Sequence, residues 1–255
     1  GLALHTADDI GFLGPEPING WGLLNTKKAA EEISKNGLYS WISEEVLEQG
    51  ETFTMIVRSD ETNPLLASIS WTDLPGGLSS GINDGSPVLV NDLDIRITQN
   101  TETFEPWKLT SVSNNSKGDN IVDPYERVDV DGASGEYTIT ITHKGTLADG
   151  PQKFSLIVTG IESDFTFTTN NSNKTTCSDS DIVFDFDYIQ LASGTTNFQV
   201  QNLPSGASFN FSQASLSSSG TTSLTISDLV NIPAGLYQID IIGDNRFMGL
   251  EEFSI

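Results

Sequence analysis

The amino-acid sequence predicts a mainly β protein made of two β-sandwich domains behind a short helical segment. Short runs of alternating apolar and polar residues recur along most of the chain, which is the pattern of strands with one buried face. Turn-forming pairs such as Asp-Gly separate these runs. The chain has 255 residues, more than one all-β domain usually needs, so two sandwiches are expected.

Residues 1–37 differ from the rest because they show helical signals. Residues 2–7 are typical of the end of a helix, and the Gly- and Pro-containing residues 11–20 predict a loop. Asn25 is a good N-cap for a second helix whose alanines and isoleucine share one face. The Asn-Gly pair at residues 36–37 then provides a stop signal.

Residues 38–160 are expected to form a jelly-roll β-sandwich, and residues 161–255 an immunoglobulin-like β-sandwich. Each part holds about seven short strand patterns, which suits such domains. The second part is richer in Ser, Thr and Asn, and a long surface loop is expected at residues 74–87 of the first. The strands are predicted at residues 51–58, 65–72, 88–98, 106–112, 125–130, 136–142 and 153–159, and then at 164–169, 181–189, 196–201, 207–211, 221–227, 235–242 and 250–255.

The strand predicted at residues 88–98 carries the densest chemistry in the sequence. Its apolar residues alternate with polar ones, so the carboxylates of Asp92 and Asp94 share the face opposite the core. Calcium is a hard cation that prefers several carboxylate and carbonyl oxygens. We therefore predict a calcium site formed by Asp92, Asp94, Asp119 and Glu126, although the EF-hand pattern is absent.

Other interpretations of these residues remain open. Asp92 and Asp94 are also explained, as single residues, by solvent-facing or turn-bonding carboxylates that pair with Arg96 or Lys108. Exposed aromatic rings are a second type of candidate, because they can stack on sugars or peptides. The aromatic candidates are Trp71, Phe104, Trp107 and Tyr125, of which Trp71 is expected in the core and Trp107 half-buried at an edge.

The charge of the chain limits its partners. It has 12 basic and 35 acidic residues, a net charge of −23, which argues against binding to nucleic acid or to an anionic membrane surface. No apolar run approaches the ~20 residues that span a bilayer. Cys177 is the single cysteine, so an intrachain disulfide is excluded, and we expect this thiol to be buried in the last domain.

Several motifs resemble those of a known family. The segments in question are Trp71-Thr72-Asp73-Leu74-Pro75, Val90-Asn91-Asp92-Leu93-Asp94, Gly135-Glu136-Tyr137-Thr138 and Gly150-Pro151-Gln152-Lys153-Phe154-Ser155-Leu156. In this order they resemble the C-terminal jelly-roll domain of one branch of the subtilisin-like serine peptidases. Upstream, Leu4-His5-Thr6-Ala7 and Gly20-Trp21-Gly22-Leu23-Leu24-Asn25 resemble the end of that family's catalytic domain. Residues 161–255 resemble, more loosely, the small immunoglobulin-like modules of secreted bacterial peptidases.

The resemblance implies a function for the longer protein and a limit for this chain. The chain would be the non-catalytic C-terminal fragment of a secreted or cell-surface subtilisin-like endopeptidase, with residues 1–37 as the helical tail of the catalytic domain. The family's His-Gly and Gly-Thr-Ser-x-Ala motifs are absent, so no catalytic residue is carried over. His5 is instead expected to face a neighbouring element. The implied partners are the missing catalytic domain and a protein or peptide substrate, and the family's jelly-roll domains also carry calcium.

Two other classes of function compete with this interpretation. One is a cell-surface module that binds carbohydrate or protein, and the other is a structural spacer. The coding sequence immediately upstream discriminates between them. The peptidase interpretation expects Gly-Thr-Ser-x-Ala within a few tens of residues, whereas the other two do not.

Overall fold

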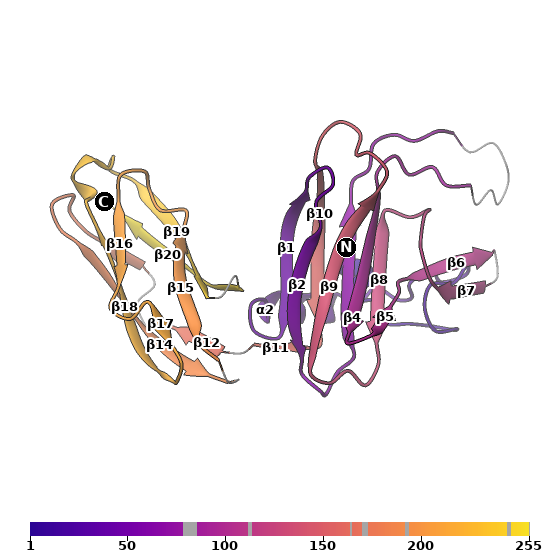
Figure 1. The fold of residues 1–255 in the computed structure, drawn as a ribbon, viewed down its shortest axis with the longest axis horizontal. Coiled ribbons are helices and arrows are strands. Elements are labelled where there is room, and N and C mark those ends of the chain that lie inside the picture. The colour runs from indigo at the N-terminus through magenta and orange to yellow at the C-terminus, as the bar shows by residue number, and fades with distance from the viewer. Residues whose placement is uncertain are drawn as a thin grey trace. The chain divides into compact units, whose positions relative to one another are not determined.

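The structure is a computed structural model that describes residues 1–78, 86–111, 114–163, 165–169, 173–191, 194–243 and 246–254. Strands dominate it, which confirms the predicted mainly β class (Figure 1). The chain divides into two compact units, Gly1–Glu162 and Ser163–Ile255. No helix among the described residues is long and apolar enough to cross a membrane.

The first unit begins with two helices and continues in strands. The helices are α1 (Leu2–His5) and α2 (Thr26–Ser34). The side chain of Asn25 accepts a hydrogen bond from the backbone N–H of Lys28 at 2.8 Å, so it caps α2 as expected. The strands are β1 (Ser40–Leu47), β2 (Phe53–Ser59), β3 (Leu65–Trp71), β4 (Asp92–Gln99), β5 (Glu102–Phe104), β6 (Trp107–Ser111), β7 (Asn114–Lys117), β8 (Tyr125–Val130), β9 (Glu136–Lys144), β10 (Gln152–Thr159) and β11 (Ile161–Glu162).

These strands form two antiparallel sheets and a hairpin. One sheet has the order β1-β10-β3-β8, the other has the order β11-β2-β9-β4-β5, and β6 pairs with β7. Apolar side chains from both sheets, such as Ile69, Ile95 and Leu156, make one core, so the two sheets form a β-sandwich, the first sandwich. Strand β1 lies where no strand was predicted. Its register with β10 spans Ser40 to Leu47.

The strand predicted from residue 88 begins only at Asp92, and the sequence motifs explain why. The carboxylate of Asp73 accepts hydrogen bonds from the backbone N–H groups of Val90 at 2.7 Å and Asn91 at 3.0 Å, which holds these residues out of the sheet. Asn91 in turn donates to Gln152 Oε1 at 2.8 Å. Three of the motifs therefore meet and fasten the ends of the long loop, of which residues 79–85 lie outside the described residues.

The second unit is also a β-sandwich. Its strands are β12 (Phe165–Thr168), β13 (Asn173–Thr175), β14 (Ile182–Gln190), β15 (Thr196–Gln201), β16 (Ser208–Phe211), β17 (Ser215–Leu216), β18 (Gly220–Ser227), β19 (Leu236–Gly243) and β20 (Arg246–Ser254), with a short 3-10 helix at Leu229–Asn231. The sheets have the orders β12-β14-β18-β16 and β13-β20-β19-β15-β17. The hydroxyl of Tyr237 donates to the carbonyl of Pro233 at 2.6 Å and fixes the turn that leads into β19.

The prediction that Cys177 is buried is wrong. Phe184 and Phe186 are buried on β14 as their alternation requires, but Cys177 precedes that strand and is exposed. Its carbonyl accepts a hydrogen bond from the N–H of Ser180 at 3.0 Å, so it belongs to the turn between β13 and β14. A turn at the surface leaves its side chains in water, whatever the apolar character of the following strand.

We therefore expect a thiol reagent to label Cys177 in the native protein. The exposed side chain needs no opening of the fold, so the labelling rate should match that of the same protein unfolded in urea. Absorbance of the released chromophore measures both rates, and Cys177→Ser gives the background. Labelling that occurs only in urea would contradict the exposed position.

Candidate functional site

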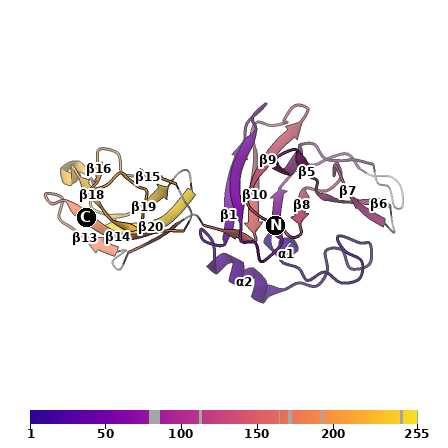
Figure 2. The same ribbon diagram turned by 60° about the horizontal axis from the view of Figure 1, so that its bottom comes forward.

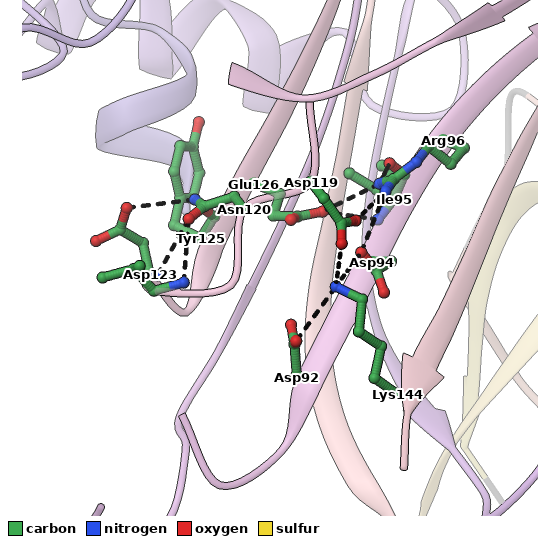
Figure 3. Close-up of polar contacts among 11 residues, drawn as sticks. Asp92, Asp94, Ile95, Arg96, Asp119, Asn120, Asp123, Tyr125, Glu126 and Lys144 are labelled. Atoms are coloured by element: carbon green, nitrogen blue, oxygen red, sulfur yellow. Dashed lines mark hydrogen bonds and ion pairs between the residues drawn. The ribbon is translucent and has the colours of Figure 1, made fainter. Parts of the chain in front are cut away.

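All four residues that the sequence predicts as metal ligands come together in the first unit (Figure 3). Asp92 and Asp94 lie on β4, Asp119 lies in the loop before β8, and Glu126 lies on β8. Because β4 and β8 belong to different sheets, these residues join the two layers of the first sandwich. Asp94 is 6% exposed, although it lies on the strand face opposite the core.

Two basic side chains lie among these carboxylates. The Nζ atom of Lys144, at the end of β9, lies 3.2 Å from Asp92 Oδ2 and 3.0 Å from Asp94 Oδ1. It also lies 2.7 Å from Asp119 Oδ2. Arg96 lies 3.3 Å from Asp94 Oδ1 and is ion-paired with Asp119 as well. Each cation therefore contacts both Asp94 and Asp119, and we call these five residues together with Glu126 the charge cluster.

The pairing of Asp94 with Arg96 agrees with the interpretation that these carboxylates pair with a nearby basic residue. Lys108, the other basic residue considered, is not part of the charge cluster. The lysine of the charge cluster is Lys144, which lies opposite Asp92 in the register between β4 and β9. Sequence reasoning missed Lys144 because this register depends on strand pairing across the sheet. The only available signal was its position at the end of an alternating run.

Glu126 accepts a hydrogen bond from the backbone of the facing sheet. Its side chain is 0% exposed, and its Oε2 accepts a hydrogen bond from the backbone N–H of Ile95 at 2.8 Å. Strand β5 pairs only with residues 97–99 of β4, so the N–H of Ile95 at this edge lies beyond the end of the ladder. Glu126 supplies the acceptor that a longer β5 would have supplied. Among the described residues its Oε1 has no hydrogen-bond partner.

Burial determines the protonation of this site. Burial raises the pKa of Glu126 to about 8, and only the bond from Ile95 and the nearby cations oppose it. Burial, followed by the hydrogen bond with Asp119, raises the pKa of Asp94 to about 6. Burial also acts to raise the pKa of Asp119, but its hydrogen bonds with Asp94, Lys144 and Arg96 outweigh burial and hold that pKa below its usual range. Near neutral pH, Glu126 is therefore mostly uncharged.

The carboxylate oxygens of the charge cluster are the atoms that could bind the predicted calcium ion. Carboxylate oxygens suit calcium, and Asp92 Oδ1 and Glu126 Oε1 are buried without a hydrogen-bond partner among the described residues. However, Lys144 lies between three of the four carboxylates, and within the described chain no group of three or more such side chains is arranged to hold a metal ion. Calcium binding by these residues stays a prediction, and it requires Lys144 to move.

Residues 1–39, the N-terminal segment, run beside the sheet that contains β8 (Figure 2). A second polar network fixes the segment to this sheet. The guanidinium of Arg127 lies 4.6 Å from the ring centroid of Trp21, and the rings of Trp21 and Tyr125 meet edge to face at 5.1 Å. Arg127 donates two hydrogen bonds to the carboxylate of Asp129, at 2.7 and 2.8 Å. Asp129 also accepts from Trp107 Nε1 at 2.8 Å.

This network overturns part of the aromatic prediction. Trp107 and Tyr125 are buried beneath the N-terminal segment, so neither ring offers a free face to a sugar or peptide. Trp107 is more deeply buried than the half-buried edge position predicted for it. Trp71 lies in the core, as expected, and Phe104 is half-buried against that core.

Comparison with known proteins identifies no family. No protein-family model and no curated protein matches the sequence. A DUF4785 family protein from Legionella pneumophila has 9% identity and a TM-score of 0.42, over 87% of this chain and 66% of that chain. The D0-D1 domain of Intimin has 10% identity and a TM-score of 0.24, over 81% of this chain and 99% of that one. Function must therefore be argued from the residues of this chain.

Replacing Glu126 by Gln is expected to remove a loss of stability that accompanies a rise in pH from 4.5 to about 8. The folded-state pKa of about 8 lies above the ordinary value of 4.5, so the folded state binds this proton more tightly than the unfolded state. The free energy of unfolding therefore falls as the pH rises from 4.5 to about 8. At about 1.4 kcal/mol for each pKa unit, the loss is on the order of 5 kcal/mol.

Urea unfolding of the wild type and of E126Q, at several pH values across this range, measures the effect. Glu102 is exposed, so Glu102→Gln is the matched control and should follow the wild type. If the wild type and E126Q depend on pH in parallel, the proton is not held by Glu126.

The calcium prediction can be tested through Lys144. Because Lys144 and a calcium ion compete for the same carboxylates, Lys144→Gln should increase any rise in the melting temperature caused by millimolar calcium. The double variant Asp92→Asn, Asp94→Asn should abolish that rise, and magnesium should substitute poorly because it demands tighter octahedral geometry. Calorimetry resolves the shift. The absence of a shift in both the wild type and K144Q would exclude a calcium site here.

Proposed function

We propose that this chain is the non-catalytic C-terminal region of a secreted subtilisin-like serine endopeptidase, and that it stabilises the catalytic domain. The observation that carries the proposal is the character of the N-terminal segment. This segment contains the residues that resemble the end of the family's catalytic domain. It is fixed to the first sandwich and exposes several large apolar side chains.

The N-terminal segment has a specific internal conformation and a specific attachment to the rest of the first unit. Asp8 and Leu23 exchange backbone hydrogen bonds of 2.9 and 2.8 Å, and a Cβ atom on Gly22 would lie 2.0 Å from the carbonyl oxygen of Asp8. Gly22, at a φ of 104°, therefore accepts no side chain. Asn115 on β7 donates to the carbonyls of Leu13 and Pro15, both at 2.8 Å. The glycine at position 22 of the Gly20–Asn25 motif is therefore explained by the structure of this chain.

The N-terminal segment exposes an unusual number of large apolar side chains. Six large apolar residues between positions 12 and 33 keep between 57% and 88% of their surface exposed. Single exposed apolar residues are ordinary, but such a density is typical of a surface that contacts another protein. These residues are Phe12, Leu13, Ile18, Leu23, Leu24 and Ile33. A catalytic domain folded around the same segment would cover them.

The competing function as a carbohydrate-binding module has less support. It requires aromatic rings with a free face, and Trp71, Trp107 and Tyr125 are all buried. The negative charge of the chain favours neither function. A peptidase region is therefore the better proposal, with a peptide substrate handled by the longer protein.

The proposal predicts that this chain alone does not hydrolyse peptide bonds, because it lacks the Gly-Thr-Ser motif. A protein that also includes the upstream coding sequence should cleave casein, and a serine-directed inhibitor should stop it. Activity of the chain alone that survives repurification, or an upstream sequence without Gly-Thr-Ser-x-Ala, would contradict the proposal.

The apolar surface gives a second readout in the same proteins. Leu24→Ser should change the free energy of unfolding of this chain by less than about 0.5 kcal/mol, because Leu24 is exposed here. In the longer protein the same change should lower the melting temperature of the catalytic domain. Leu191→Ser, at a similarly exposed leucine of the second unit, is the control and should affect neither.

A further inference from the structure

His5 is buried at the junction between the N-terminal segment and the first sandwich. It is the last residue of α1 and is 1% exposed. Its Nδ1 lies 2.8 Å from the hydroxyl of Ser68 on β3, and its Nε2 lies 3.0 Å from the hydroxyl of Thr159 on β10. Both hydroxyls can donate or accept, so a neutral imidazole satisfies both contacts in either tautomer. A single side chain thus joins α1 to two neighbouring strands.

The charged groups that face this imidazole are all positive. They are Arg127 on β8 and Lys28 on α2, together with the amino group of Gly1, which would be an uncharged amide in a longer protein. Burial, and after it these three charges, lowers the pKa of His5 from 6.5 to about 3. The imidazole is therefore neutral wherever the N-terminal segment is docked at ordinary pH. A proton on the ring would be a buried charge beside other cations, which is among the costlier arrangements in a protein interior.

We propose that acid detaches the N-terminal segment from the first sandwich, because His5 accepts a proton only after it has left its place between β3 and β10. The segment would then be a pH-sensitive joint built into the fold. This inference depends on the burial of His5, its contacts and the positive charges of Arg127 and Lys28, and it holds whether or not the chain belongs to a peptidase. If it does, acid would loosen the joint between the catalytic domain and the first sandwich.

The direction of the effect follows from proton linkage. In the detached state His5 titrates near its ordinary value of 6.5, whereas in the docked state it titrates near 3. The detached state therefore binds the proton more tightly. Docking is strongest above 6.5 and weakens about tenfold for each pH unit below that value, until the docked ring is itself protonated near 3.

Hydrogen exchange compares the wild type with His5→Gln, which can keep hydrogen bonds to both hydroxyls but does not titrate. The reporters are the N–H groups of Thr6 and Ala29, which bond to Leu2 and Asn25 within the two helical turns. Taking the ratio of wild type to H5Q at each pH cancels the intrinsic change in exchange rate. From pH 6.5 to about 4.5 the opening of the segment should rise about a hundredfold in the wild type relative to H5Q.

Equal opening of the wild type and H5Q across this range would overturn the proposal. If H5Q fails to dock at any pH, nuclear magnetic resonance of the imidazole decides instead. The chain has only two histidines, so His143→Gln leaves a single ring signal from His5. That signal should not titrate around 6.5 while Thr6 stays protected. A ring that titrates there in the docked protein would disprove the proposal.

Discussion

The edge where β4 meets β8 is the constraint on which the first sandwich depends. Elsewhere apolar side chains hold the two sheets together, but here β5 stops early and leaves the N–H of Ile95 at the end of the ladder. Glu126 supplies the missing acceptor from the opposite sheet, which places a carboxyl group in the interior. Burying a carboxyl group is costly when it is charged and unpaired. The raised pKa of Glu126 keeps this group mostly protonated near neutral pH, which avoids that cost.

The rest of the charge cluster follows from that arrangement. Asp94 and Asp119 hold Arg96 and Lys144 above the buried acid, and Asp119 brings the loop before β8 onto β4. Arg96 and Lys144 neutralise most of the charge on the aspartates of the cluster. This matters in a protein with a net charge of −23. Removing one partner of a buried ion pair commonly costs about 3–5 kcal/mol. Lys144 and Asp119 have side chains 40% and 42% exposed, so solvent screens their contributions and makes them smaller. The cluster therefore stabilises the fold whether or not it also binds an ion.

The local sequence pattern correctly predicted the features that depend only on residues close together in the chain. The alternation of residues 92–98 gave the strand and its two faces, and the cap of Asn25 gave α2. What pattern missed depends on pairing between distant segments. Lys144 enters the cluster through the β4–β9 register, and Trp107 is buried because the N-terminal segment covers it. The prediction that Cys177 is buried failed for another reason. The apolar face of a strand does not determine whether the turn before it is buried.

The two polar networks of the first unit respond to acid in opposite directions. Protonation favours the folded state at Glu126 and Asp94, whose pKa values are raised, so mild acid strengthens the edge that joins the two sheets. Protonation disfavours docking at His5, whose pKa is lowered. The contacts of His5 lie between the N-terminal segment and the sheet, whereas those of Glu126 lie within the sandwich itself. Acid should therefore release the segment while the sandwich stays folded, which makes the opening a local event with its own free energy.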